Sequence, residues 1–152
     1  MDVEIRPARR EDVAAIAAMF AGDELGGHGD SADPADLPAY TSAFDAIDGS
    51  PNDQLFVAVR GGEIVGTFQT TLITSLTGKG STNLTIEAVH TRSDMRGHGL
   101  GEAMISHAIE QARTSGARLV QLMSNANRAG AHRFYSRLGF SQSHLGFKMK
   151  LR

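Results

Sequence analysis

The fold is decided by the stretch Arg96-Gly97-His98-Gly99-Leu100-Gly101, in which three alternating glycines follow an arginine. An apolar segment precedes the stretch and an amphipathic segment follows it. Glycine lets the backbone come close to a ligand, and the first N–H groups of a helix attract anions. The stretch therefore predicts a turn between a strand and a helix that holds a phosphate group.

The spacing of the glycines excludes two common phosphate-binding motifs. A dinucleotide fingerprint would need a third glycine at the position of Glu102, and a nucleotide-triphosphate loop would end in Lys followed by Ser or Thr. What remains is an Arg-x-x-Gly-x-Gly pattern over residues 96–101. The alternative interpretation is a glycine-rich turn that only starts a helix.

Length and composition predict one soluble domain over residues 1–152. No apolar run reaches the roughly 18 to 20 residues of a membrane span, and the N-terminus lacks the apolar core of a signal peptide. We therefore expect a cytoplasmic protein with no membrane partner. The absence of cysteine excludes disulfides and thiolate metal sites. A pI near 6.3, without a basic stripe carrying aromatic residues, argues against nucleic-acid binding.

Charge is distributed unevenly along the chain. Residues 1–60 hold 12 Asp or Glu against 4 Arg, whereas residues 61–152 hold 5 against 11 Lys or Arg. Residues 21–53 contain eight carboxylates and no Lys or Arg. The basic half suits a polyanionic cofactor and the acidic segment suits a cationic substrate, although acidic caps and loops can also be merely solvated.

Hydrophobic periodicity predicts a mixed order of strands and helices. Strands are expected at residues 3–7, 55–59, 64–72, 83–91 and 119–123, and helices from Arg10, from Pro34, from Leu100 to about residue 115, and over residues 128–138. Residues 140–151 are expected to add one or two closing strands. The strand at 119–123 should lie parallel to the one at 83–91, because a helix connects them. The order is typical of an α+β domain.

A second motif lies at residues 127–140, which read Asn-Arg-Ala-Gly-Ala-His-Arg-Phe-Tyr-Ser-Arg-Leu-Gly-Phe. This stretch and the Arg-x-x-Gly-x-Gly pattern together resemble the two signatures of the GNAT superfamily of acetyl-CoA-dependent N-acetyltransferases. The resemblance covers about residues 54–147. It implies a GNAT fold, with a mixed, mostly antiparallel sheet of six to seven strands, about four flanking helices, and a splay at the parallel strand pair that holds the cofactor.

The resemblance implies acetyl-CoA as co-substrate and no metal. Its pyrophosphate would lie on the N–H groups of residues 97–101 beside Arg96, and its pantetheine along the backbone of Val89 and Thr91. The side-chain amide of Asn127 would hold the pantetheine. The expected cofactor contacts are Val89, His90, Thr91, Arg96, Gly97, His98, Gly99, Leu100, Gly101, Asn127 and His132.

Acetyl transfer needs a base to remove a proton from the acceptor's ammonium group. Glu87 is the leading candidate, since a carboxylate in so apolar a strand is unexpected unless it faces a cleft; the alternative is a Glu on the solvent face or in a salt bridge. His90 is another candidate, although strand alternation predicts that it points to the opposite face. By family analogy, the Val89 amide would stabilise the oxyanion and Tyr135 would protonate the leaving thiolate; a purely structural Tyr135 is the alternative.

The acceptor is expected to contact Glu24, His28 and Glu87, because the loop after the first helix often borders the acceptor pocket in this family. The acidic segment favours a small cationic or polar primary amine. The C-terminal stretch also resembles bacterial aminoalkylphosphonate N-acetyltransferases, which is one alternative. The others are a protein N-terminal or lysine acetyltransferase and a non-catalytic acetyl-CoA-binding module. Because the family often dimerises through its C-terminal strands, a homodimer is the expected assembly.

Overall fold

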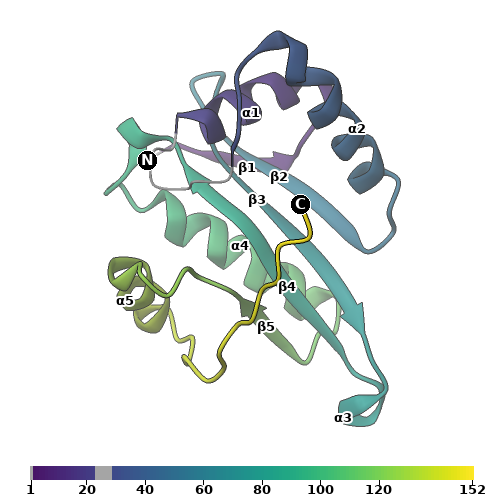
Figure 1. The fold of residues 1–152 in the computed structure, drawn as a ribbon. Coiled ribbons are helices and arrows are strands. Elements are labelled where there is room, and N and C mark those ends of the chain that lie inside the picture. The colour runs from purple at the N-terminus through teal and green to yellow at the C-terminus, as the bar shows by residue number, and fades with distance from the viewer. Residues whose placement is uncertain (1, 23–28) are drawn as a thin grey trace.

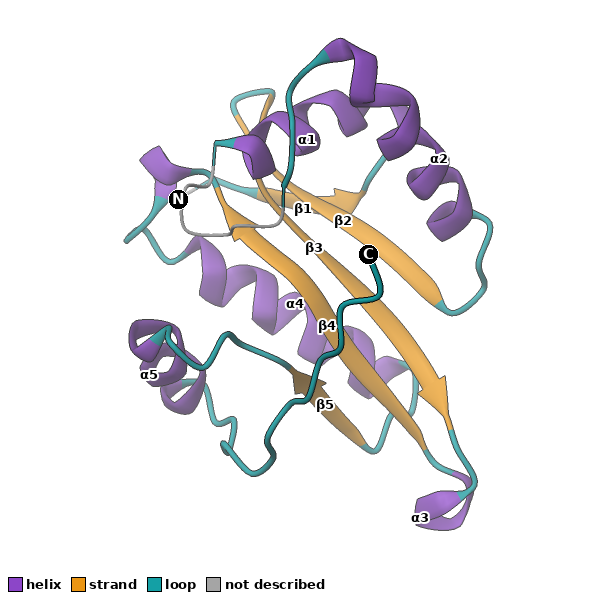
Figure 2. Ribbon diagram, viewed as in Figure 1, coloured by secondary structure: helices purple, strands orange, loops and turns teal. Residues whose placement is uncertain are grey.

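A mixed five-stranded sheet forms the centre of the computed structural model, which describes residues 2–22 and 29–152. The strands lie in the order β1 (Glu4–Pro7), β2 (Asp53–Arg60), β3 (Glu63–Thr74), β4 (Thr82–Thr91) and β5 (Leu119–Leu122). Each of the first four strands is antiparallel to its neighbour, and β5 is parallel to β4. Figures 1 and 2 show the long β2, β3 and β4 at the middle of the sheet.

Helices cover both faces of this sheet. The helices α1 (Val13–Ala21) and α2 (Leu37–Asp48) pack on one face and α4 (Leu100–Thr114) on the other (Figure 1). Next to β5, on the α4 side, lies α5 (Ala129–Arg137), while the one-turn α3 (Thr77–Gly80) tips the β3–β4 hairpin. Single 3-10 turns occupy Arg10–Asp12, Pro34–Asp36 and Ser93–Met95.

The main core lies between the sheet and α4. Apolar residues spaced three or four apart give α4 one buried face, formed by Leu100, Met104, Ile105, Ala108 and Ala112. Phe68, Leu84 and Ile86 meet this face from β3 and β4. A Cβ atom added to Gly66 would lie 2.9 Å from the sulfur of Met104, so only glycine lets β3 approach α4 this closely.

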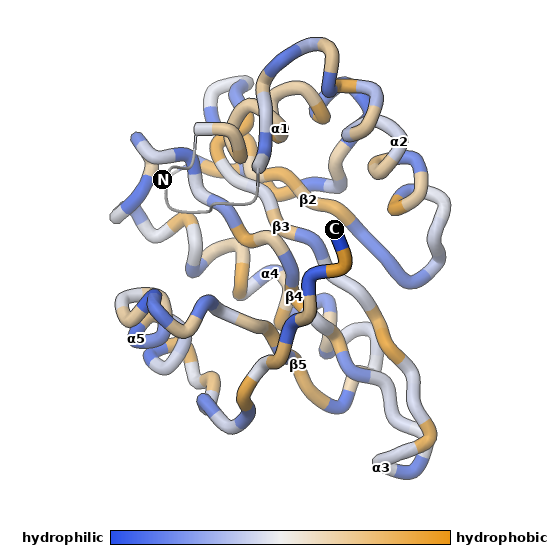
Figure 3. The backbone as a smooth tube through the Cα atoms, viewed as in Figure 1, coloured by the Kyte–Doolittle hydropathy of each residue, from blue (hydrophilic) through white to orange (hydrophobic). Residues whose placement is uncertain are grey.

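The expectation of six to seven strands was wrong, because residues 140–151 form no strand. Hydrophobic and hydrophilic segments do alternate towards the C-terminus (Figure 3). The apolar residues Leu145, Phe147, Met149 and Leu151 are nevertheless 81–93% exposed. An alternating pattern determines which side chains share a face, whereas a strand also needs a backbone to pair with. No backbone hydrogen bond joins residues 141–152, the C-terminal arm, to any other described residue.

Candidate functional site

A β-bulge interrupts β4 at the point where the candidate base lies. The register pairs Glu87 with Gln69 and His90 with Thr67, so two residues of β4 oppose Phe68 alone. Ala88, one of these two, has a φ of 53°, a conformation that residues other than glycine seldom adopt. Bulges of this kind occur next to active sites, where they redirect side chains.

The bulge places Glu87 and His90 on the same face of the sheet, because their partners on β3 are two residues apart. The expectation that strand alternation separates these two side chains was therefore wrong. Val89 points the other way and packs against the α4 core. The His90 ring contacts the ring of Phe20, at the end of α1, edge to face at 5.6 Å. Glu87 is exposed.

The parallel strands part beside the bulge. The ladder between β4 and β5 joins residues 83–86 to residues 119–122 and ends there. Beyond Ile86, the edge of β4 that carries Val89 and Thr91 has no pairing with β5. An unpaired strand edge next to a cavity can accept an extended ligand as an added strand.

The glycine turn, residues 96–101, connects β4 to α4 through the 3-10 turn Ser93–Met95. Gly97 and Gly99 have φ values of 80° and 81°, which favour glycine, and a Cβ atom on either would meet nothing within 4 Å. The first N–H groups of α4 have no acceptor within the helix. Arg96 and His98 are exposed beside these groups, whereas Leu100 is buried and can offer only its backbone.

A ring contact joins the glycine turn to α5. The Phe134 ring lies 3.3 Å from the position that a Cβ atom on Gly101 would occupy. Tyr135, the next residue, is half-buried. Its ring lies edge to face against those of Phe134 and Phe140, with ring centroids 5.2 Å and 6.0 Å away. Burial raises the pKa of the Tyr135 phenol, partly opposed by Arg128, so this hydroxyl keeps its proton at neutral pH.

Asn125 holds the loop before α5, a role that the sequence analysis missed. Its side-chain oxygen accepts a 2.9 Å hydrogen bond from the Asn127 N–H, and its carbonyl oxygen lies 2.8 Å from the His132 Nε2. The Asn-x-Asn spacing was the available signal, because Asn side chains commonly bond the backbone two residues ahead. Asn127 itself is exposed.

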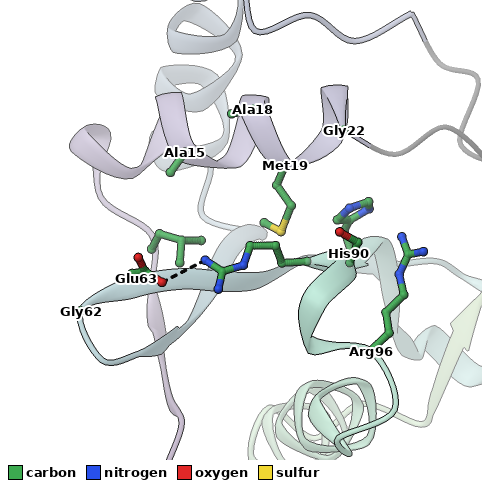
Figure 4. Close-up of a pocket in the computed structure, with 11 residues that line it drawn as sticks. Ala15, Ala18, Met19, Gly22, Gly62, Glu63, His90 and Arg96 are labelled. Carbon is green, nitrogen blue, oxygen red and sulfur yellow. Dashed lines mark hydrogen bonds and ion pairs between the residues drawn. The ribbon is translucent and has the colours of Figure 1, made fainter.

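A cavity of about 510 Å³ lies between α1, the β2–β3 turn and the end of β4 (Figure 4). Its lining residues are Ala15, Ala18, Met19, Gly22, Gly62, Glu63, Ile64, His90, Arg92, Ser93 and Arg96. Arg92, which the sequence analysis also missed, donates to Asp94 at 2.6 Å and to Glu63 at 3.2 Å. The cavity therefore reaches from α1 to the first residue of the glycine turn.

The expected acceptor contacts Glu24 and His28 lie outside the described residues. The segment that follows is anchored by Tyr40, whose hydroxyl donates to Asp30 at 2.7 Å and accepts from the Ser31 N–H at 3.0 Å. Among the described residues, no three His, Asp or Glu side chains are grouped to hold a metal ion. None of the described helices is long and apolar enough to cross a membrane.

Comparison with known proteins gives consistent matches. The family model described as acetyltransferase (GNAT) family matches residues 13–140. An aminoalkylphosphonate N-acetyltransferase of Salmonella typhimurium is 32% identical over 148 residues, which cover 97% of this chain and 91% of the relative. A crystal structure described as a transcriptional regulator from Bacillus halodurans has a TM-score of 0.95 and 40% identity, covering 99% and 100% of the two chains. A putative acetyltransferase from Agrobacterium tumefaciens has a TM-score of 0.80 and 26% identity, covering 97% and 99%.

Proposed function

The chain belongs to the acetyltransferase (GNAT) family, and we propose that it moves an acetyl group from acetyl-CoA to the primary amine of a small acceptor. The amine attacks directly, with both substrates bound. The observation that carries this proposal is the parting of β4 from β5 between the glycine turn and the bulge. It supplies an anion site and an unpaired strand edge in one continuous path.

Each part of the donor has a candidate partner. The pyrophosphate binds the N–H groups of the glycine turn, with Arg96 adding a charged hydrogen bond. The pantetheine pairs with the β4 backbone at Val89 and Thr91. Asn127 would approach it from the loop before α5, and His132 from α5 itself. This assignment uses the exposed backbone of the glycine turn and does not need the buried side chain of Leu100.

The chemistry follows from groups around the bulge. Glu87 is proposed to receive the proton of the acceptor's ammonium, directly or through an intervening group, and the freed amine nitrogen forms a bond to the thioester carbon. The Val89 N–H stabilises the negative charge that develops on the thioester oxygen. As the carbon–sulfur bond breaks, Tyr135 gives its proton to the thiolate, which leaves as free CoA. The second proton lost by the attacking nitrogen then restores the Tyr135 phenol.

Two classes of acceptor are supported by different observations. The eight carboxylates of residues 21–53 favour a cationic or polar amine, such as a polyamine or an amino sugar. The similarity to an aminoalkylphosphonate N-acetyltransferase, with Arg92 and Arg96 in the cavity lining, favours an amine that carries an anionic group as the second candidate.

A substrate panel tests the function and separates these classes. The purified chain is given acetyl-CoA with spermidine, glucosamine, ethanolamine, 2-aminoethylphosphonate or a lysine-containing peptide, and the free CoA thiol is measured. We expect thiol release with at least one small amine. Release with the peptide alone would support a protein acetyltransferase, and acetyl-CoA binding without release would support a non-catalytic module. Either result contradicts the proposed reaction.

We also propose a homodimer in which the C-terminal arm contacts a second copy. The large apolar side chains exposed within the described ranges all lie at the β3–β4 tip, on β5 or directly after it, and on this arm: Ile73, Leu76, Leu119, Met123, Leu145, Phe147, Met149 and Leu151. Exposed patches of this kind mark interaction surfaces. Sedimentation should give twice the 16.2 kDa chain mass. Phe147→Glu should give monomers. The control Ala46→Glu, on the outer face of α2, should remain a dimer. A monomeric wild type would contradict the proposal.

A further inference from the structure

We infer that His90 takes the proton from the acceptor's ammonium group and passes it to Glu87, which returns it to solvent. The inference rests on the proposed acetyl transfer. It assigns a catalytic role to a side chain that simple strand alternation would place on the far face from Glu87, and the bulge at Ala88 is what brings the two to one face.

The cavity distinguishes His90 from Glu87. His90 lines it, together with residues of α1 and the β2–β3 turn, whereas Glu87 is not among the lining residues (Figure 4). An acceptor that occupies this cavity therefore meets the imidazole before it meets the carboxylate. The Phe20 ring, edge to face at 5.6 Å, holds the imidazole from the α1 side.

The spacing along β4 suits a proton transfer between the two groups. Same-face neighbours along a strand are about 7 Å apart, a gap that the side chains and one water can bridge. Glu87 is exposed, so a proton that reaches its carboxylate can leave to bulk water. The proton balance has two parts. The ammonium loses one proton to His90 before the attack, and this proton leaves to solvent through Glu87. The nitrogen loses a second proton after the attack, and this proton replaces the one that Tyr135 gives to the leaving thiolate.

Among the described residues, those around His90 and along its cavity carry charges of both signs. The uncharged Phe20 of α1 contacts the imidazole ring, and Met19 of α1 and Glu63 of the β2–β3 turn line the same cavity. Arg92 and Arg96 follow His90 along the chain, and Arg92 is paired with Glu63 and Asp94. Imidazole is intrinsically a stronger base than a carboxylate, so it is the better acceptor for an ammonium proton.

His90→Phe is the deciding variant, because it keeps a ring against Phe20 and removes the base. We expect kcat/KM at pH 7 to fall about 100-fold and to recover with rising pH, as the free amine becomes more abundant. Binding of acetyl-CoA, measured by calorimetry, should not change, because the His90 side chain lies on the α1 side and only its backbone could contact the donor. In Glu87→Gln, kcat/KM at pH 7 should fall about tenfold, since His90 can still release its proton to water. The control Glu110→Gln, at an exposed carboxylate of α4 outside the proposed sites, should match the wild type.

The outcomes separate this inference from the proposed function. If the wild type acetylates an amine and His90→Phe keeps both its rate and its pH profile, His90 has only a packing role. If only Glu87→Gln shows a loss of kcat/KM that recovers with rising pH, the carboxylate is the base and the proposed relay is wrong. If the wild type acetylates no amine in the panel, the proposed function itself fails.

Discussion

The two halves of β4 differ in how completely they are paired. Residues 82–86 bond to β3 on one side and to β5 on the other, and Leu84 and Ile86 from this half are buried against α4. Residues 87–91 pair with β3 alone, contain the bulge and are exposed or half-buried. A complete ladder uses every backbone group for stability, whereas an interrupted one leaves groups for ligands. Substitutions in and around the two halves should therefore separate stability from activity.

The largest effect is expected at Tyr135 on α5, whose proposed role is in the reaction beside the unpaired half of β4. Tyr135→Phe should lower kcat about 100-fold or more, because the thiolate would leave without a positioned proton donor. The melting temperature and the acetyl-CoA dissociation constant should stay near wild type. Steady-state kinetics measures kcat, thermal unfolding measures the melting temperature, and calorimetry measures the dissociation constant. Tyr40→Phe, the change at the other tyrosine of the chain, is the control, and an unchanged kcat in Tyr135→Phe would remove this residue from the mechanism.

The fully paired half should respond in the opposite manner. Leu84 is 0% exposed, so Leu84→Ala should lower the free energy of unfolding by about 2–5 kcal/mol through lost contacts and a cavity. Molecules that remain folded should keep their kcat. The same change at Leu119 on β5, which is 37% exposed, should cost less than about 1 kcal/mol. Denaturant unfolding measures both, and equal losses would contradict the comparison.

A smaller effect is expected at the glycine turn, which continues the unpaired half. Arg96→Gln should raise the acetyl-CoA dissociation constant about tenfold, because one charged hydrogen bond to phosphate is lost. The loss should shrink in high salt. Arg113→Gln is the matched control, since Arg113 is exposed on α4 and pairs with Glu110. Calorimetry that finds equal affinities for the two variants would place the pyrophosphate elsewhere.

The smallest effect is expected on α4, where burial shifts the pKa of His107. His107 contacts the rings of Phe56 and Phe68 at 5.0 and 6.0 Å, and burial lowers its pKa below the ordinary 6.5. The folded chain therefore binds this proton less strongly than the unfolded chain. Its contribution to stability is complete above about pH 6.5 and is lost as the pH falls through the lower, folded-state pKa.

His107→Leu should remove this acid-side loss, whose slope is at most about 1.4 kcal/mol per pH unit. The His107 Nδ1 is buried and has no hydrogen-bond partner among the described residues, so leucine breaks no polar contact. The unfolding free energy of the variant minus that of the wild type, measured between about pH 5 and pH 8, should increase as the pH falls. Parallel curves would show that His107 is not responsible.

Much of the fold was predictable because its elements carry local signals. The hairpin of β2 and β3, the long α4 and the parallel β5 were confirmed, each with an apolar pattern of the right period. The closing strands over residues 140–151 were not, because the alternation of Leu145, Phe147, Met149 and Leu151 specifies a face but no partner. The expected five-residue strand at 119–123 ends one residue earlier, where β4 and β5 part.

The candidate site was predictable where it depends on motifs and not where it depends on backbone geometry. The glycine turn and Tyr135 lie on the elements that their motifs indicated. No such signal predicts the bulge, because the residue with the positive φ is Ala88 and not a glycine. The shared face of Glu87 and His90 depends on that one residue, and so does the redirected side chain of His90. Arg92 enters the cavity only through the fold.

The contact between Gly101 and the Phe134 ring also sets a length. It fixes the spacing between the start of α4 and Tyr135, and therefore between the ends of any donor that uses both. A donor with a shorter arm could place its phosphates on the glycine turn, but its sulfur would not reach the phenol. In the proposed donor site, a small acetyl thioester carries the same reactive group as acetyl-CoA but lacks the phosphates that would bind the glycine turn. The fixed spacing would therefore favour the full-length donor.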